Sequence, residues 1–312
     1  MALPARLVPV ARPTPLPGID AAGLQARVWA LLTSPTWKPP VLPAVAVEVV
    51  QLAQKPAVHF PDVVRALEKD PVLAAKVVSL AQSAAYAGRG GGIVSLYQAT
   101  VRLGIKQLRD LVVEASLQLK VFKVPGYGAA MTRLARHSTA TAHVMRSMCR
   151  RVQLDAEHAF LAGLLHDVGI AGGLLALAEE PRLSALSFEA LGPVLEQAHQ
   201  QISLQLTRTW KLLPEVQELV STHHAIVVGG RARPLNAALI LAEQLVWEAG
   251  AGLAPAPDTA RPTSVETPAP PPGALDAVPP ERVAEALMVL KLDRVALATA
   301  RGEAFQIVKQ LG

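Results

Sequence analysis

The chain has little cysteine and few aromatic residues. Cys149 is its only cysteine, so no disulfide can form within the chain and no cysteine-based zinc site is available. A lone cysteine also fits a reducing compartment. Aromatic residues make up 4% of the 312 residues, whereas hydrophobic residues make up 51%. The core must therefore be built from alanine, leucine and valine, which favours packed helices.

Long apolar runs are scarce as well. No apolar run reaches the length of a membrane span without a charged residue. Residues 1–18 contain several prolines and lack the continuous apolar stretch of a signal peptide. We therefore expect a cytoplasmic protein that does not enter a membrane.

The charge is moderately basic and is not massed in one segment. The formal net charge is +5, and the densest basic cluster is formed by Arg146, Arg150 and Arg151. A solvated helix face explains this cluster, whereas nucleic-acid binding would call for a recognition helix or an aromatic platform, and neither stands out. We therefore rank nucleic acid last among the partners.

The distribution of proline and glycine predicts how the chain is organised. Nine of the thirty residues from 251 to 280 are proline, which is typical of a disordered linker. We predict, in order, a flexible proline-rich leader with one short helix (1–40), a helical subdomain (41–124), a second helical subdomain (126–250), that linker (251–280) and C-terminal helices that pack back on the body (281–312).

Several helix ends can be predicted from single residues. Asp70, Ser95 and Asp155 each precede a helical pattern and can accept a hydrogen bond from the first turn. Gly104 is expected to break the helix that starts after Ser95. These positions predict short helices joined by tight turns.

The most informative motif is Gly163-Leu164-Leu165-His166-Asp167-Val168-Gly169, a His-Asp pair that ends an apolar helical run. Adjacent histidine and aspartate side chains can reach one metal ion if the helix is interrupted directly after them, and we expect Gly169, Gly172 and Gly173 to loosen the chain there. Four more histidines recur around the pair at intervals that suit a helical metal cage: His137, His199, His223 and His224. This pattern indicates a metal-dependent phosphohydrolase or a descendant of one.

The remaining histidines and the large aromatic residues call for simpler interpretations. His59, His143 and His158 are offset from this pattern and are expected to be surface or packing residues. Cys149 is expected to be a small apolar filler, and Trp210 a core anchor. The histidines of the cage could also be packing residues that hydrogen-bond within helix interfaces, with His223 and His224 at a helix C-terminus.

Residues 42–247 resemble the HDOD domain, a divergent branch of the HD phosphohydrolases. The motifs that carry the resemblance follow one another in order: Leu42-Pro43, Glu68 to Val78, Ala81 to Ala84, Ala99 with Leu103-Gly104, Arg136-His137-Ser138, Ala159 to Gly169, Trp210 to Pro214 and His223-His224. The resemblance implies an all-α fold in which two helical bundles pack together. It also implies a role in bacterial signalling, usually without catalysis.

The same resemblance implies a set of candidate metal ligands: His137, His166, Asp167, His199, His223, His224 and Glu243. This mixture of nitrogen and oxygen ligands suits Mn, Fe or Zn. If the protein were an active enzyme, Asp167 would be its essential residue, and Arg133 or Arg136 could contact a phosphate.

Two positions depart from active relatives of this superfamily. Glu243 stands where an aspartate is expected, so its carboxylate is displaced by a methylene group. Ile170 stands where related cyclic-dinucleotide phosphodiesterases have a lysine that would meet the substrate phosphate. These departures favour a non-catalytic signalling or scaffolding module that binds a protein partner, with a vestigial metal or nucleotide site. The alternative is a metal-dependent phosphohydrolase or phosphodiesterase acting on a nucleotide or cyclic dinucleotide.

Overall fold

A computed structural model of the chain describes residues 21–87, 93, 95–155, 158–180, 183, 186–253 and 278–311. The fold is all-α, as predicted. The elements are α1 (Ala21–Leu32), α2 (Ala44–Ala53), α3 (Phe60–Glu68), α4 (Pro71–Ala81), α5 (Ala84–Ala87), α6 (Leu96–Ser116), the π-helical turn η1 (Leu117–Val121), α7 (Gly128–Arg151), α8 (Ala159–Leu165), α9 (Val168–Ala178), α10 (Phe188–Thr209), α11 (Pro214–Thr222), β1 (Val227–Val228), β2 (Arg231–Ala232), α12 (Pro234–Glu248), α13 (Pro280–Leu290) and α14 (Arg294–Leu311). The predicted flexibility of residues 1–20 and disorder of residues 254–277 lie outside the described residues.

The predicted helix starts are confirmed at two of three caps. The Asp70 carboxylate accepts a hydrogen bond from the Leu73 amide at 3.0 Å, and the Ser95 hydroxyl accepts one from the Gln98 amide. The predicted break at Gly104 is confirmed: its φ of +75° and ψ of 166° are non-helical and divide α6 into two segments that meet at a kink, because only glycine adopts that backbone conformation at little cost. The third cap was wrong: α8 begins at Ala159, with His158 rather than Asp155 at the N-cap position.

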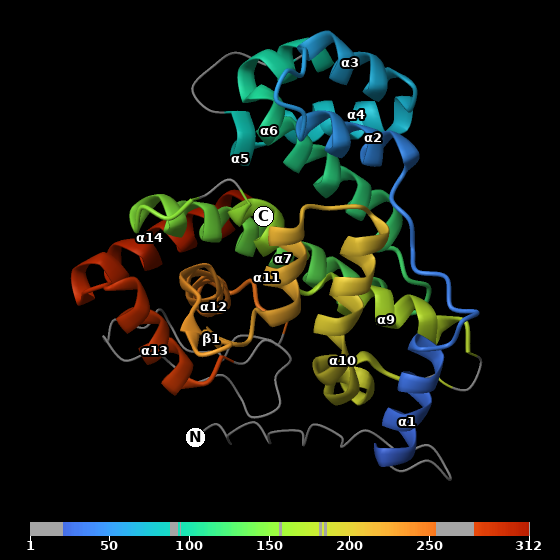
Figure 1. The fold of residues 1–312 in the computed structure, drawn as a ribbon, viewed down its shortest axis with the longest axis vertical. Coiled ribbons are helices and arrows are strands. Elements are labelled where there is room, and N and C mark those ends of the chain that lie inside the picture. The colour runs from blue at the N-terminus through green and yellow to red at the C-terminus, as the bar shows by residue number, and fades with distance from the viewer. Residues whose placement is uncertain are drawn as a thin grey trace, which may run out of the picture.

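Helices α2, α3, α4 and α6 form one group of packed helices, shown at the top of Figure 1. Their contact faces are apolar and fully buried, with Val49, Leu67, Leu73 and Leu111 each at 0% exposure. Burial of each such side chain contributes about 1.5–3 kcal/mol.

Helices α7 to α12 form the second group. The closest neighbours are α7 with α8, α9 with α10, and α12 with α7. One continuous cluster of buried apolar side chains runs through both groups, from Val28 to Leu253. Trp210 is fully buried within this cluster, and its indole nitrogen donates a hydrogen bond to the Pro40 carbonyl at 2.8 Å. The prediction that Trp210 is a core anchor is thus confirmed.

The C-terminal helices α13 and α14 lie against α12 and α7 (Figure 1). A second buried cluster fills this contact and includes Leu245, Val283 and Val308. At its edge the Arg301 guanidinium donates a hydrogen bond to the Glu248 carboxylate at 2.8 Å. These contacts hold α13 on α12, and α14 on α7 and α12.

One stretch of the described chain is long and apolar enough to cross a membrane by length and composition. It is Ala159–Ala178, with a mean hydropathy of 1.7, and 94% of it is buried inside the protein. That burial is typical of a core helix.

Cys149 is fully buried on α7. Burial, together with the nearby Asp155 carboxylate, raises the pKa of the Cys149 thiol to about 12. Because the thiolate is the reactive species, we expect no alkylation by iodoacetamide at pH 8 in the native protein and complete alkylation in denaturant, measured by intact mass. Rapid labelling of the native protein would contradict the buried position.

Candidate metal centre

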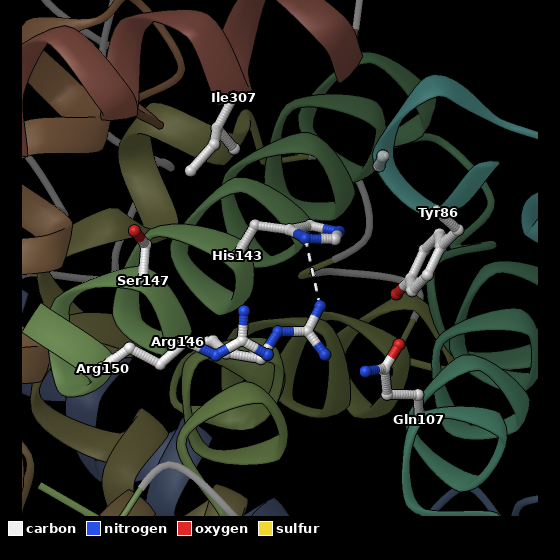
Figure 2. A pocket seen from close by; sticks show the side chains of 8 residues that line it. Tyr86, Gln107, His143, Arg146, Ser147, Arg150 and Ile307 are labelled. Carbon is white, nitrogen blue, oxygen red and sulfur yellow. Dashed lines mark hydrogen bonds between the residues drawn. The ribbon is translucent and has the colours of Figure 1, made fainter. Parts of the chain in front are cut away.

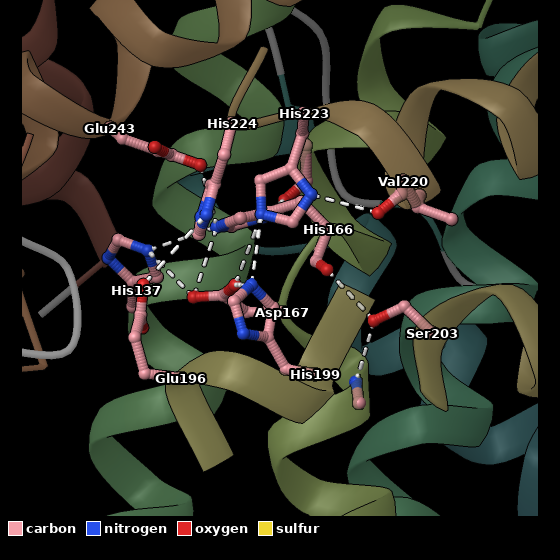
Figure 3. A network of polar contacts seen from close by, with 12 residues as sticks. His137, His166, Asp167, Glu196, His199, Ser203, Val220, His223, His224 and Glu243 are labelled. Atoms are coloured by element: carbon pink, nitrogen blue, oxygen red, sulfur yellow. Dashed lines mark hydrogen bonds and ion pairs between the residues drawn. The ribbon is translucent and has the colours of Figure 1, made fainter. Parts of the chain in front are cut away.

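Six side chains from separate parts of the second group converge on one buried point (Figure 3). They are His137 from α7, His166 and Asp167 from the turn between α8 and α9, His199 from α10, His223 from the end of α11, and Glu243 from α12. Each of the four histidines is fully buried, and the two carboxylates are buried as well. With His224, which joins the cluster at its rim, the structure brings together all seven ligand candidates predicted from the sequence.

The turn between α8 and α9 positions the His-Asp pair. The helix is interrupted at Asp167, whose φ and ψ are −101° and 9°, so the two adjacent side chains point to the same side. The Ser203 hydroxyl of α10 donates a hydrogen bond to the His166 carbonyl and accepts one from the Gly169 amide, both at 2.9 Å. Ser203 is thus a positioning residue that sequence reasoning missed. Its signal was a small polar residue one helical turn after His199.

The glycines after the motif do not loosen the chain, which corrects the prediction. Gly169, Gly172 and Gly173 all lie inside α9 and face α10. A Cβ at Gly169 would lie 2.0 Å from the His199 carbonyl oxygen. Because this distance is far below van der Waals contact, only glycine allows α9 and α10 to approach so closely. The same approach brings His199 next to Asp167.

Asp167 lies between two pairs of histidines. Its Oδ2 atom is 3.3 Å from Nε2 of His166 and 3.9 Å from Nε2 of His137. Its Oδ1 atom is 3.4 Å from Nε2 of His199 and 3.6 Å from Nε2 of His223. The carboxylate can therefore bridge two metal positions, one on the side of each oxygen.

The backbone fixes which ring nitrogen of each histidine faces the centre. Every Nδ1 atom lies within hydrogen-bond distance of a backbone carbonyl, at Ala251 for His137 (3.1 Å), Gly163 for His166 (2.8 Å), Leu195 for His199 (3.2 Å) and Val220 for His223 (2.8 Å). Since a carbonyl only accepts, Nδ1 carries the proton of the neutral ring, and Nε2 presents its lone pair inward in that form. Such anchoring is typical of metal-bound histidines.

The inward-facing nitrogens fit a cation. Nε2 of His137 lies 3.3 Å from Nε2 of His166, and Nε2 of His199 lies 3.2 Å from Nε2 of His223. Two lone pairs at this distance repel each other unless a proton or a metal ion lies between them. The donor set, which is histidine nitrogen with carboxylate oxygen, is the one that Mn, Fe and Zn prefer.

The charges of the site also favour a cation. Burial favours the neutral acid, but the adjacent His166 and the other ring nitrogens outweigh it and hold the pKa of Asp167 well below its usual range. Burial opposes protonation of His166, but the Asp167 and Glu243 carboxylates overcome this and raise its pKa to about 9. For His223 burial prevails and lowers the pKa to about 4. The centre thus holds ionised carboxylate in a buried place.

One further candidate ligand lies on each side of the Asp167 carboxylate: Glu243 beside His166, and His224 beside His199 and His223. Glu243 Oε1 lies 3.3 Å from Nε2 of His166, so its longer side chain still reaches the cluster. His224 lies at the rim, with its side chain 30% exposed, its ring 4.2 Å from that of His223, and its Nδ1 atom 3.8 Å from Glu196 Oε1. Its ring atoms group with those of His199 and His223 as possible ligands, and those of His137 and His166 group with Asp167.

The residues predicted to meet a phosphate make contacts elsewhere. The Arg136 guanidinium donates a hydrogen bond to the Gly250 carbonyl at 3.0 Å. That of Arg133 lies over the Phe188 ring and 4.0 Å from the Glu189 carboxylate. Ile170 is fully buried in the core, so it presents no charge to the cluster. A phosphate contact by either arginine stays a prediction.

An all-α fold with a buried cluster of histidine and aspartate side chains at a break between two helices is the arrangement expected of an HDOD domain. The chain belongs to the HDOD domain family, whose pattern matches residues 40–226. A search of curated protein sequences finds no match.

Solved structures show the same fold. The chain is similar to a candidate metal-dependent phosphohydrolase from Shewanella amazonensis, with 17% identity, a TM-score of 0.68, and coverage of 93% of this chain and 99% of the other. It is also similar to an HDOD domain protein of unknown function from Geobacter sulfurreducens, with 20% identity, a TM-score of 0.60, and coverage of 93% and 99%. A candidate signal transduction protein from Marinobacter aquaeolei matches at 20% identity and a TM-score of 0.63, with coverage of 94% and 65%.

Proposed function

We propose that this HDOD protein is a signalling module that holds two divalent metal ions in a closed site and acts by binding a protein partner rather than by turnover. The observation that carries the proposal is the arrangement around Asp167. Each carboxylate oxygen faces two histidine nitrogens, and each side has one further candidate ligand, Glu243 or His224. Four protein ligands per ion is the count of a closed structural site.

The surroundings of the cluster support a structural role for the metals. Ile170 supplies no positive charge, and the guanidinium groups of Arg133 and Arg136 are engaged with Glu189, Phe188 and the Gly250 carbonyl. The ligands come from α7, the α8–α9 turn, α10, α11 and α12. Metal ions held there would tie these helices together, because a site that exists only in the folded chain adds its binding free energy to folding.

A second candidate function is hydrolysis of a phosphate ester. It is favoured by the bridging position of Asp167, because a bridging carboxylate is suited to holding two metal ions side by side. Bound metals would supply Lewis acidity and an activated water. Asp167 would orient both ions, and the backbone-anchored histidines would keep their lone pairs on them.

Metal analysis together with an activity assay tests both candidates. We expect about two metal ions per purified chain by mass spectrometry. We also expect a lower melting temperature after chelation, recovery when Zn or Mn is restored, and no hydrolysis of bis(p-nitrophenyl) phosphate or cyclic dinucleotides. Hydrolysis that disappears in Asp167→Ala, with no partner recovered by affinity purification, would overturn the non-catalytic proposal. Absence of metal in protein purified without chelators would overturn both.

A further inference from the structure

A polar cavity lies away from the metal centre, where α5, α6, α7 and α14 meet (Figure 2). Its volume is about 260 Å³. Four of its residues come from the second half of α7, namely His143, Arg146, Ser147 and Arg150, and Tyr86, Gln107 and Ile307 close the other sides. The metal ligand His137 belongs to the first half of the same helix.

The tautomer of His143 is fixed by its neighbour. Nδ1 of His143 lies 3.2 Å from Nη2 of Arg146. Because a guanidinium group can only donate, Nδ1 must accept, so the proton of the neutral ring resides on Nε2. Burial, followed by the positive charge of Arg146, lowers the pKa of His143 to about 3, and the ring is therefore neutral at physiological pH.

The N–H group at Nε2 of His143 is buried and has no hydrogen-bond partner among the described residues. His143 itself is 9% exposed. A buried donor without a partner costs about 1–3 kcal/mol, so a native protein seldom keeps one without a reason. At the wall of the cavity the ring packs edge-to-face against Tyr86 and Phe160, with centroids 5.1 Å and 5.2 Å away (Figure 2). The Tyr86 hydroxyl donates to Glu114 at 2.7 Å, and no described residue accepts from Nε2 of His143, so we infer that a ligand accepts from it.

The charges around the cavity are unbalanced toward positive. Arg151 pairs with Glu303, whereas Asp110, 2.7 Å from Arg109, is the one carboxylate shared by Arg109 and Arg146 in the described part of the chain. The Arg146 guanidinium is held over the Phe160 ring at 4.4 Å and is 3.8 Å from Asp110. The exposed Arg150 makes no ion pair within the described part of the chain.

We propose that this cavity binds a small molecule with an oxyanion group, such as a phosphate or a carboxylate. The oxyanion accepts a hydrogen bond from Nε2 of His143 and is paired with Arg146 and Arg150. Both arginines lie on one face of α7, because residues four apart are neighbours on a helix. The Gln107 side chain and the apolar Ile307 flank the remainder of the ligand. A ligand bound in the cavity would contact α6, α7 and α14 together.

Binding to the full chain tests the proposal. Inorganic phosphate and succinate are titrated separately at constant ionic strength against chloride, and binding is followed by calorimetry and by the ¹⁵N and ¹H shifts of His143 Nε2–H. We expect saturable binding of at least one oxyanion and a shift of that N–H signal. Arg150→Gln is expected to weaken binding about tenfold, as for loss of one charged hydrogen bond. The control Arg294→Gln removes the same charge from an exposed position at the start of α14 and should change nothing.

The two probes distinguish a phosphate from a carboxylate head group, and either one supports an oxyanion site. If neither oxyanion differs from chloride, the proposal is overturned. It is also overturned if Arg150→Gln and Arg294→Gln bind the oxyanion equally well with no shift at His143. That result would place the ion elsewhere, for example at the metal centre.

Discussion

Replacing Asp167 by alanine is expected to abolish the proposed binding of two metal ions and to destabilise the protein by about 3–5 kcal/mol, as for the loss of one partner from a buried ion pair. The reason is that, among the described residues, Asp167 alone places one oxygen beside each histidine pair, at 3.3 Å and 3.4 Å. Substitution of outer-shell partners costs 10–100-fold in metal affinity, so loss of the bridging ligand should cost more than about 100-fold. Metal content by mass spectrometry and urea unfolding measure the two effects.

Asparagine at the same position separates charge from packing. The amide fills the volume of the carboxylate and can donate to one of the two histidine pairs. Asp167→Asn should therefore lose the metals but destabilise the metal-free protein less than alanine does. The control Asp62→Ala removes a carboxylate from a surface ion pair with Arg65, where the expected loss is within about 1 kcal/mol. Full metal content in Asp167→Asn would show that the bridging carboxylate is not required.

The helix boundaries were predictable where they depend on local chemistry. Asp70 and Ser95 cap their helices because a short polar side chain satisfies an amide in the next turn, whatever lies further away. Asp155 carries the same local signal, yet α8 begins at Ala159. The position of α8 is set by Phe160, Leu164 and Leu165, which are fully buried, so burial and not the cap decides where this helix starts.

The members of the metal cluster were predictable, but their mutual arrangement was not. The sequence indicates His137, His166, Asp167, His199 and His223 because the histidines recur at intervals that suit a helical metal cage and match the HDOD pattern. It contains no information on which carbonyl orients each ring, because those carbonyls come from the fold. The effect of Glu243 was also hard to judge. An added methylene displaces a carboxylate on a fixed backbone, whereas the structure shows Oε1 at 3.3 Å from His166.

The glycines of α9 show most directly how a local rule can fail. In an isolated segment, glycine lowers helix stability, so three glycines in five residues predict a loose chain. In the fold the missing side chains allow α10 to lie against α9, and burial of both helices outweighs the low propensity. The contact also determines the distance from Asp167 to His199, so these glycines are required for the geometry of the metal centre.

Gly169→Ala is therefore expected to be among the most destabilising single-methyl substitutions in the protein, by at least about 4 kcal/mol. The new Cβ would lie 2.0 Å from the His199 carbonyl oxygen and 2.8 Å from the Ser203 amide nitrogen. Both are backbone atoms, which cannot move unless the helices separate. Separation would break the Ser203 hydrogen bonds and withdraw His199 from Asp167, so metal content should fall together with stability. Urea unfolding followed by circular dichroism measures the change.

Alanine substitutions at two further glycines provide a scale for the effect at Gly169. At Gly172 the added Cβ would meet side-chain atoms of Leu206 at 2.9 Å and Ile202 at 3.0 Å, which can shift, so Gly172→Ala should cost about 1–3 kcal/mol. At Gly302, inside α14, nothing lies within 4 Å, and alanine should stabilise the helix by about 0.5–1 kcal/mol. The order of destabilisation, Gly169 above Gly172 above Gly302, follows from what each methyl group meets. Equal effects at Gly169 and Gly302 would mean that α9 and α10 do not pack as closely as described, and the distance from Asp167 to His199 would no longer have a structural cause.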